Sequence, residues 1–440
     1  MRRRTLALIA AGAVIVVALV VGVVTAGAQG PSSLPSITVS QLLQNVATKA
    51  QGTTAISGDI AWTNGLFGGA SSLLSLSGNQ TPAGLSSLLT GGSGRVWAQG
   101  GKVRLESQGQ NGDFVAVAAG ATIWTWDSMT TTATRYALPA ATGGTSLPAP
   151  SPETGLDPAT AVERLIQKLA PHATLTLGAP ATVAGRQTYT LTLTPTSPVT
   201  SFGSLAVAID GQRWVPLRLQ VFAKGDGSPV LSAGFKTVSF GPISNSLFTF
   251  TPPSGATVVH RNVSRGQSLA GTAGKAAGKT AGASAGSDVR HRPLTLAQAR
   301  SQAPYLLTPS STPAGIEFRG AFVTPTKAVS GLTPGGSLTA GQSRALAALA
   351  EHPTAVLDYG SGFGTVLVIE SRTTAAQDAQ IQQQLGQLTT IGKTAVNGGP
   401  ATKLQTPLGS ALTFRQGDVR VVVVGLVPWS DLTQIAGSLR

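Results

Sequence analysis

The most regular pattern in the sequence is a two-residue alternation of apolar and polar side chains between residues 183 and 259. Alternation of this kind predicts half-buried antiparallel strands. Between two of these strands, Asp210-Gly211 supplies the residue of positive φ that a tight hairpin needs. We therefore expect a β-meander with one apolar and one polar face. The large side chains expected on the apolar face are Tyr189, Leu191, Leu193, Leu205, Val207, Ile209, Leu217, Leu219 and Val221.

Three stretches of the meander also carry a family resemblance. They are Val183-Ala-Gly-Arg-Gln-Thr-Tyr-Thr-Leu191, Ala208-Ile-Asp-Gly-Gln-Arg-Trp-Val-Pro-Leu-Arg218 and Ser246-Leu-Phe-Thr-Phe-Thr-Pro-Pro-Ser-Gly-Ala256. Together they resemble the second half of the LolA-like lipoprotein-carrier superfamily, which includes periplasmic lipoprotein carriers and envelope-stress regulators of the RseB type. The resemblance implies a curved sheet that holds a hydrophobic ligand, with helices across its concave face. None of the motifs of this superfamily is catalytic.

Before the meander, the sequence predicts further strands and one amphipathic helix. The strands are expected at residues 55–62, 95–97, 102–106, 114–118 and 122–127. Trp124 and Trp126 share a face because they are two residues apart, and they belong either to the core or to the wall of a ligand cavity. Leu165 and Ile166 lie on the apolar stripe of a helix that begins after Asp157. The resemblance implies that this helix partly plugs the cavity.

These observations give a set of candidate ligand-binding residues. The expected hydrophobic cavity is lined by Leu105, Trp124, Trp126, Leu191, Leu193, Leu205, Val207, Leu217, Leu219, Leu165 and Ile166. The segment 64–94 is rich in Gly and Ser, yet it contains seven leucines and one phenylalanine. It is either ordinary core or a movable lid over the cavity. The lid candidates are Leu85, Leu88 and Leu89.

The composition shifts divide the chain into four parts. Residues 1–28 form an N-terminal apolar segment, 37–260 a LolA-like curved-sheet domain, 261–302 a flexible basic Gly/Ala/Ser linker, and 303–440 a small α+β domain. In the last part, Asn397-Gly398 predicts a hairpin turn, and a helix is expected from Ser430 with Leu432 and Ile435 on its buried stripe. The expected fold class is α+β, mainly antiparallel β. It comprises a curved half-barrel sheet with helices across its concave face and a smaller C-terminal α+β domain.

The N-terminal segment predicts a location outside the cytoplasm. Arg2-Arg3-Arg4 precedes an uncharged apolar run from Leu6 to about Ala28, near the length needed to cross a bilayer. Because positive residues remain inside, the expectation is a single-pass membrane protein with its N-terminus inside. The alternative is a signal peptide cleaved after Ala28, which would give a secreted protein.

Charge and composition exclude several function classes. The net charge is +14, but residues 2–4 and 261–292 carry eight of these positive charges. The remaining positive charges are spread too thinly along the chain to indicate nucleic-acid binding. The basic segments suit attraction to the cell membrane instead. The chain has no cysteine, and its four histidines show no metal-ligand spacing. We therefore expect no catalytic residues, no metal and no cofactor.

The function expected from the sequence is non-enzymatic binding. The leading hypothesis is a membrane-tethered carrier or chaperone that binds an acyl chain of a lipid or lipoprotein in the sheet cavity. The alternative is an envelope-stress sensor that binds a regulatory membrane protein of the anti-sigma type. The sequence does not distinguish the carrier from the sensor.

Overall fold

The computed structural model describes residues 34–49, 55–66, 91–109, 112–137, 170–262, 293–324, 353–386 and 392–440. These residues fall into two compact units, each built on one sheet. The larger unit contains the described residues up to 196 together with 203–262, and the smaller unit contains residues 197–202 with 293–440. Both sheets are mainly antiparallel, so the expected fold class is confirmed.

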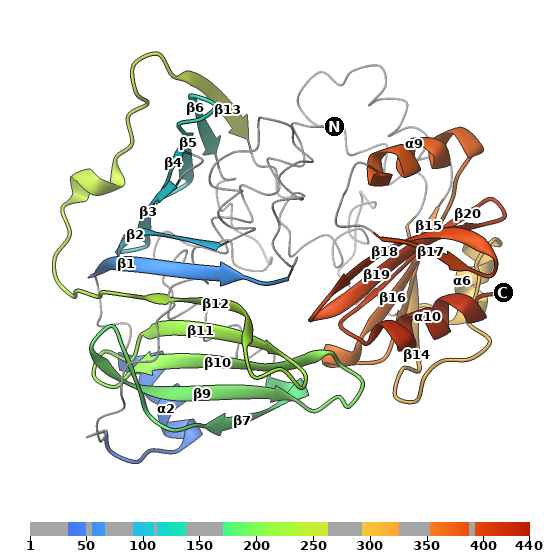
Figure 1. The fold of residues 1–440 in the computed structure, drawn as a ribbon, viewed down its shortest axis with the longest axis horizontal. Helices are drawn as coiled ribbons and strands as arrows, with labels where there is room; N and C mark the ends of the chain where they lie inside the picture. Colours follow the sequence, from blue (N-terminus) through green and yellow to red (C-terminus); the bar gives the residue numbers. More distant parts are fainter. Residues whose placement is uncertain are drawn as a thin grey trace, which may run out of the picture. The chain divides into compact units, whose positions relative to one another are not determined.

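The larger unit is a single 13-stranded sheet. The strand order is β13-β6-β5-β4-β3-β2-β1-β12-β11-β10-β9-β7, and β8 pairs with β9. The sheet is strongly curved. Figure 1 shows this, since β7 to β11 are seen face-on and β3 to β6 nearly edge-on. The strands are β1 (Ala55–Asn64), β2 (Gly91–Gln99), β3 (Lys102–Gly109), β4 (Gly112–Ala119), β5 (Thr122–Asp127), β6 (Thr132–Ala137), β7 (Ala173–Leu177), β8 (Ala181–Val183), β9 (Arg186–Pro195), β10 (Phe202–Asp210), β11 (Pro216–Ala223), β12 (Pro229–Phe235) and β13 (Thr257–Asn262).

One face of this sheet, called here the inner face, carries a continuous apolar cluster. The register pairs Ile60 with Phe235, Val96 with Leu105, and Leu105 with Ala116, so these side chains share one face. The same buried cluster extends across β11 and β12. Its members are Ile56, Ile60, Trp62, Val96, Ala98, Val103, Leu105, Phe114, Ala116, Val183, Ala208, Val215, Leu217, Ala233 and Phe235.

The turn between β10 and β11 decides which residues of the meander reach the inner face. The Asp210 N–H donates to the Val215 carbonyl (2.9 Å), while the Trp214 N–H donates to the Asp210 carbonyl (3.0 Å). Trp214 has a φ of 61°, as expected for the first residue of a bulge. Asp210 is therefore opposite Val215, and Ala208 is opposite Leu217.

This bulge corrects the expected meander. Leu217 packs in the inner-face cluster with Ala208, whereas Val207 pairs with Leu191 on the opposite face. The expectation of one apolar and one polar face across the whole meander is wrong, because both faces carry buried apolar side chains. One extra residue in a turn is enough to exchange the faces of the following strand.

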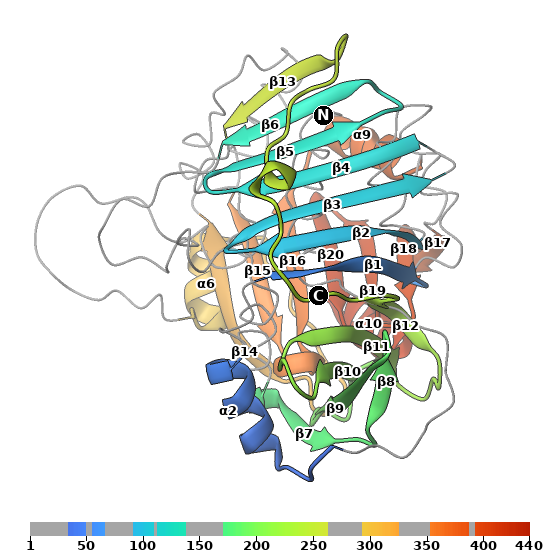
Figure 2. The ribbon, with the colours of Figure 1, turned by 90° about the vertical axis from the view of Figure 1, so that its left-hand side faces the viewer.

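The opposite face, called the outer face, is covered by two described segments. Helix α2 (Val39–Lys49) buries Leu42 and Val46 and contacts β7, and the Tyr189 hydroxyl donates to the Pro35 carbonyl just before the helix (2.9 Å). The second segment, residues 241–256, is called the strap and contains the short 3₁₀ helix η4 (Asn245–Phe248). Figure 2 shows the strap crossing in front of β2 to β5 on its way to β13.

Polar side chains of the outer face hold the strap. Gln99 Oε1 accepts from the Ile243 N–H (2.7 Å), Lys102 donates to Asn245 (2.9 Å), and Arg104 donates to the Leu247 carbonyl (3.1 Å). These three hydrogen bonds come from neighbouring positions of β2 and β3, all on the outer face. The strap therefore occupies that face along the first half of the sheet.

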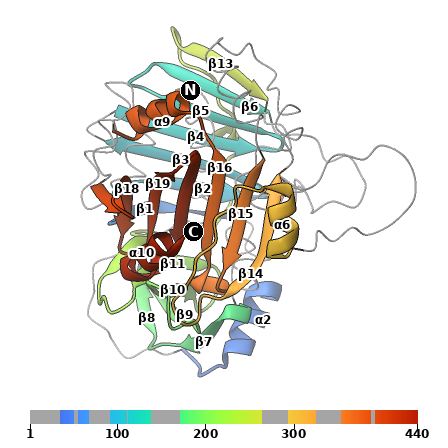
Figure 3. The ribbon, with the colours of Figure 1, turned by 90° about the vertical axis from the view of Figure 1, so that its right-hand side faces the viewer.

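The smaller unit has a 7-stranded sheet with helices on both faces (Figure 3): α6 and α10 pack on the face of the apolar core, and α9 lies on the other face, where Asp378 pairs with Arg420. The strand order is β14-β15-β16-β20-β19-β18-β17. The expected C-terminal helix is confirmed as α10, since Leu432 and Ile435 are fully buried. The elements are α6 (Leu296–Gln302), β14 (Phe318–Thr324), β15 (Thr354–Tyr359), η5 (Gly362–Gly364), β16 (Val366–Arg372), α9 (Ala375–Gly386), β17 (Gly392–Val396), β18 (Gly399–Thr406), β19 (Gly409–Gln416), β20 (Val419–Gly425) and α10 (Trp429–Ser438); η3 (Ala170–His172) precedes β7 in the larger unit.

Ordered elements extend into the range expected to be linker. Strand β13 continues to Asn262, and helix α6 begins at Leu296. A capping box starts α6, in which the Thr295 hydroxyl accepts from the Gln298 N–H and the Gln298 side chain accepts from the Thr295 N–H. The residues of the expected linker 261–302 that the structure leaves undescribed are 263–292.

The N-terminal expectation requires a correction. The apolar run from Leu6 to Ala28 lies outside the described residues. In the described part of the chain, every helix is too short or too polar to cross a bilayer. On this finding the single-pass membrane localisation expected from the sequence is contradicted, and we withdraw it.

Candidate functional site

The structure divides the candidate cavity residues between the two faces of the large sheet. Leu105, Leu217 and Leu219 lie on the inner face, as the register pairs of β3 and β11 require. Six others lie on the outer face: Trp124, Trp126, Leu191, Leu193, Leu205 and Val207. Leu165 and Ile166, together with the lid candidates Leu85, Leu88 and Leu89, lie outside the described residues.

The two tryptophans of β5 contact outer-face neighbours. Trp124 packs against Phe250 of the strap, with ring centroids 5.5 Å apart, and against His260 of β13 at 6.4 Å. The other side of β5 presents Ile123 and Thr125, which are buried. The two sets of candidates therefore cannot line one common surface, and the inner-face set is the one that joins the continuous cluster.

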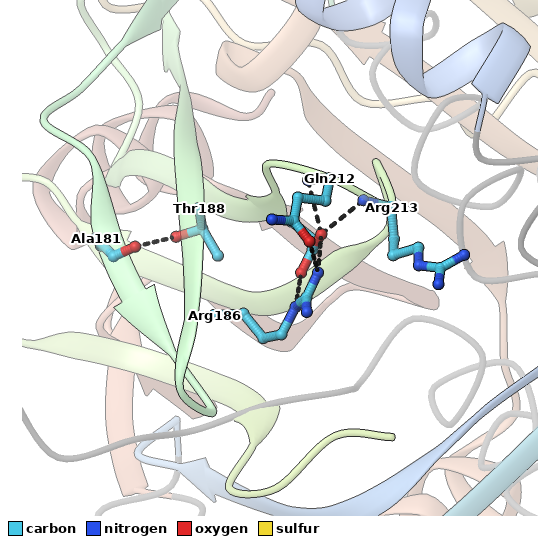
Figure 4. A network of polar contacts seen from close by, with 6 residues as sticks. Ala181, Arg186, Thr188, Gln212 and Arg213 are labelled. Atoms are coloured by element: carbon cyan, nitrogen blue, oxygen red, sulfur yellow. Dashed lines mark hydrogen bonds and ion pairs between the residues drawn. The ribbon is translucent and has the colours of Figure 1, made fainter. Parts of the chain in front are cut away.

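A polar network borders the inner face at the edge of the sheet where β9 begins and β10 ends (Figure 4). Its centre is Asp210, whose side chain is fully buried. The Arg186 guanidinium donates two hydrogen bonds to this carboxylate, Nε to Oδ2 (2.5 Å) and Nη2 to Oδ1 (2.9 Å). The backbone N–H groups of Gln212 (2.8 Å) and Arg213 (2.6 Å) also donate to Oδ1.

These contacts decide the protonation state of Asp210. Burial alone would raise its pKa, but the hydrogen bonds from Arg186, Arg213 and Gln212 outweigh burial and hold the pKa below its ordinary value. The same ion pair raises the pKa of Arg186. Asp210 is thus a charged carboxylate whose acceptor sites are filled by Arg186 and by the turn that follows it, and it fixes the geometry of the β10–β11 hairpin.

Aromatic rings and cations surround this hairpin. The guanidinium groups of Arg186 and Arg213 both lie over the Phe240 ring, at 5.2 and 5.5 Å from its centroid. Trp214 stacks on Tyr189 at 5.8 Å, and the Lys49 ammonium lies 5.1 Å from the Trp214 ring. We call Arg186, Arg213 and Phe240 the cationic rim, whereas Lys49 belongs to α2 on the outer face.

The cationic rim touches the inner-face cluster directly. Phe240, Trp214 and Ala184 are half-buried and pack against that cluster. The sequence expectations did not include Arg186 or Arg213 among the site residues. The sequence did contain a signal for Arg186. Alternation along β9 places Arg186 on the same face as Thr188, and Thr188 pairs with Asp210 in the sheet.

Metal chemistry has no basis in the residues that the structure describes. Within them, no group of three or more His, Asp or Glu side chains is arranged to hold an ion. The arrangement combines an apolar surface with a charged edge.

Comparison with known proteins gives similarities of fold. No family model matches the sequence, and no curated protein matches it. The chain is similar to the Pseudomonas aeruginosa MucA/MucB complex structure, with 13% identity, 91% of this chain and 98% of that chain covered, and a TM-score of 0.39. It is also similar to a LolA superfamily protein from Nitrosomonas europaea, with 8% identity, coverage of 49% and 99%, and a TM-score of 0.21. A DUF1329 family protein from Desulfovibrio piger shows 9% identity, coverage of 49% and 98%, and a TM-score of 0.22.

The architecture has the two parts that the resemblance in the sequence implied. A large curved antiparallel sheet is followed by a smaller sheet unit, in agreement with the motifs that carried the resemblance in the sequence.

Proposed function

We propose that this protein is a non-enzymatic binder whose inner sheet face receives the acyl chain of a lipid or lipoprotein. The observation that carries the proposal is the continuous apolar cluster of the inner face, which runs from β4 to β11. Each methylene of an acyl chain contributes about 0.8 kcal/mol when it leaves water, so a surface of this kind favours such ligands. The outer face is a poorer candidate because α2 and the strap already occupy it.

A partly accessible residue supports this assignment. Leu105 and Leu217 are fully packed, but Leu219, opposite Ala233 on the same face, is only half-buried. A half-buried leucine beside a packed cluster leaves apolar surface that a ligand can cover. Leu219 is therefore the inner-face position at which ligand contact is best tested.

The first experiment is lipid extraction. The full chain is purified without detergent, extracted with organic solvent and analysed by mass spectrometry. Recovery of a stoichiometric lipid or acylated peptide is the expected result. A protein that carries no such ligand, and takes up none from added lipid, would contradict the carrier function. That outcome would favour the alternative that the resemblance implies, in which the protein binds a regulatory membrane protein.

A pair of variants tests which face binds the ligand. Leu219→Trp fills space on the inner face, so it should lower the amount of lipid retained. Trp126→Leu changes a half-buried side chain on the outer face and should leave retention unchanged. Thermal unfolding of both empty proteins provides the control, because overpacking of a filled core costs about 1 to 3 kcal/mol. Equal loss of lipid in the two variants would contradict the inner-face assignment.

A further inference from the structure

One end of the large sheet is a strand whose outer edge is unpaired. Strand β13 pairs with β6 on one side, in the parallel direction, and is the last strand of the sheet (Figure 2). Among the described residues no further strand pairs with it. An edge of this kind presents N–H and carbonyl groups that can pair with another extended chain.

The other three sheet ends differ from β13. The backbones of Leu294 and Ala321 exchange two hydrogen bonds (2.8 and 3.0 Å) across the edge of β14. Strand β17 is five residues long and carries the exposed Lys393, a side chain that discourages edge pairing. Strand β7 is contacted by helix α2. In the part of the chain that the structure describes, β13 has neither a lysine nor a segment paired along its edge.

The direction of the hydrogen bonds identifies the outward groups of β13. The Thr257 N–H donates to the Thr131 carbonyl (2.9 Å), so the backbone of Thr257 faces the side of β6. Backbone groups alternate in direction along a strand, so those of Val259 face β6 as well, whereas those of Val258 and His260 face outward. The side chains of Val258 and His260 are both exposed. A further strand can therefore pair at these two positions.

The two outermost strands contain cationic side chains and no carboxylate. Strand β6 contains Arg135, β13 contains His260 and Arg261, and neither strand contains Asp or Glu. Within the described residues, neither arginine belongs to an ion pair. The register places Arg135 beside His260 on the outer face and Arg261 beside Tyr136 on the inner face. Positive charge therefore borders the edge on both faces of the sheet.

This charge favours an acidic partner over a second copy of the chain. Antiparallel pairing of β13 with its own copy would bring the arginines of both chains to one seam, and like charges on neighbouring strands are destabilising. An acidic strand at the same edge is attracted by these side chains.

We propose that β13 is a docking edge for an extended acidic segment of a partner protein, which adds to the large sheet as an antiparallel strand. Antiparallel pairing is the more stable direction per residue. The order of side chains in β13 then defines the partner: two successive carboxylates opposite Arg261 and His260, followed by two apolar residues opposite Val259 and Val258. The inference is independent of the acyl-binding function, because β13 contributes no residue to the inner-face cluster.

The probe is the peptide fluorescein-Gly-Thr-Glu-Glu-Val-Val-Thr-amide, and fluorescence anisotropy measures its affinity for the full-length protein. One control peptide has lysine in place of both glutamates. The acidic peptide should bind saturably and more tightly than the lysine peptide, and the difference should shrink as salt is raised. A second control is N-methylated at the second glutamate and the second valine, the residues opposite His260 and Val258. It should not bind, because it lacks the N–H groups that pair with β13.

Variants of the protein locate the docking edge. Val258→Pro removes an outward N–H and leaves the backbone of Thr257 and Val259 paired with β6, so it should lower the affinity about tenfold. The matched control, Val258→Thr, keeps this N–H and should bind the peptide as the wild type does. Arg261→Gln should lower the affinity about fivefold, as for the loss of an exposed ion pair. Circular dichroism and thermal unfolding show whether each variant folds, and the N-methylated peptide tests the same pairing without any change in the protein.

Each outcome decides for or against the docking edge. Equal affinity for the acidic and lysine peptides, or wild-type affinity in a folded Val258→Pro protein, would overturn the inference. If no peptide binds, it is overturned as well; a dimer that Val258→Pro converts to a monomer in light scattering would then assign the edge to a second copy. Lipid extraction of the Val258→Pro protein reports on the acyl-binding function separately, because that function predicts unchanged lipid retention whatever the peptides do.

Discussion

The most consequential single prediction concerns Glu370, a carboxyl group in the core of the smaller unit. Glu370 lies on β16 and its exposed fraction is 0%. One oxygen, Oε2, accepts from the Leu307 N–H (2.8 Å), and Oε1 has no hydrogen-bond partner among the described residues. Burial outweighs the hydrogen bond from Leu307 and raises the pKa of Glu370 from 4.5 to about 8. The folded protein therefore holds this carboxyl protonated at neutral pH.

The sign of the pH dependence follows from the two pKa values. Between pH 4.5 and about 8 the unfolded chain releases the proton of Glu370 and the folded chain keeps it, so the free energy of unfolding falls as the pH rises. Each pH unit is worth at most about 1.4 kcal/mol. Over the whole window the loss approaches about 5 kcal/mol, an upper limit that applies at pH 8 and above.

Glu370→Gln removes the titrating group and keeps a similar shape. The variant should show a flat pH dependence from this site, with stability close to the wild type at pH 5 and higher by up to about 5 kcal/mol at pH 8. Hydrogen–deuterium exchange of peptides from β16, corrected for intrinsic exchange rates, reports on this unit separately from the large sheet. We expect protection of β16 to fall with pH in the wild type and to remain constant in the variant.

The matched control is Asp418→Asn. Asp418 pairs with Arg372 at 2.9 Å, but both side chains are about half exposed, at 57% and 45%. An exposed pair of this kind contributes at most about 1 kcal/mol, so its removal should leave the pH profile of β16 nearly unchanged. If Glu370→Gln followed the wild-type profile, or destabilised β16 at pH 8, a protonated carboxyl at this position would be refuted.

Three further substitutions test the local structure. Asp210→Asn leaves Arg186 without its buried counter-charge and should cost about 3 kcal/mol in urea unfolding of the large unit; a cost below about 1 kcal/mol would show that the ion pair is dispensable. Asn397→Ala should cost about 1 kcal/mol, because Asn397 has a φ of 50°, and exchange of β17 and β18 amides should rise accordingly. Thr295→Ala removes the capping box with Gln298 and should lower the protection of α6 by about 1 kcal/mol, so unchanged exchange there would argue against the cap.

Local patterns in the sequence determined the strands and several turns of this protein. The alternation around Leu191 gives β9, and the stripe of Leu432 and Ile435 gives α10, because each pattern can bury its apolar side chains in only one regular conformation. Asn397-Gly398 forms the expected turn between β17 and β18, with both residues at positive φ. Such features depend on neighbours within a few residues.

Only the tertiary structure decided which apolar side chains share a surface. Trp124 and Leu105 were grouped as candidates for one cavity, yet they lie on opposite faces because the register from β3 to β5 assigns them so. Across the β10–β11 turn, the bulge at Trp214 moves Leu217 to the face opposite Val207. The sequence pattern of a strand fixes which of its side chains share a face. Which of the two faces of the sheet they occupy depends on the number of residues in the turn that precedes the strand.

The cationic rim shows the same limit. Arg186 and Phe240 are 54 positions apart in the chain and belong to different segments, and the alternation of either segment says nothing about the other. They meet because β9 and the residues that lead into the strap reach the same end of a curved sheet, where Phe240 joins the inner-face cluster. The sequence by itself determined the elements and their apolar sides. The pairing of distant strands decided which charges border the apolar surface, because that pairing is a property of the sheet as a whole.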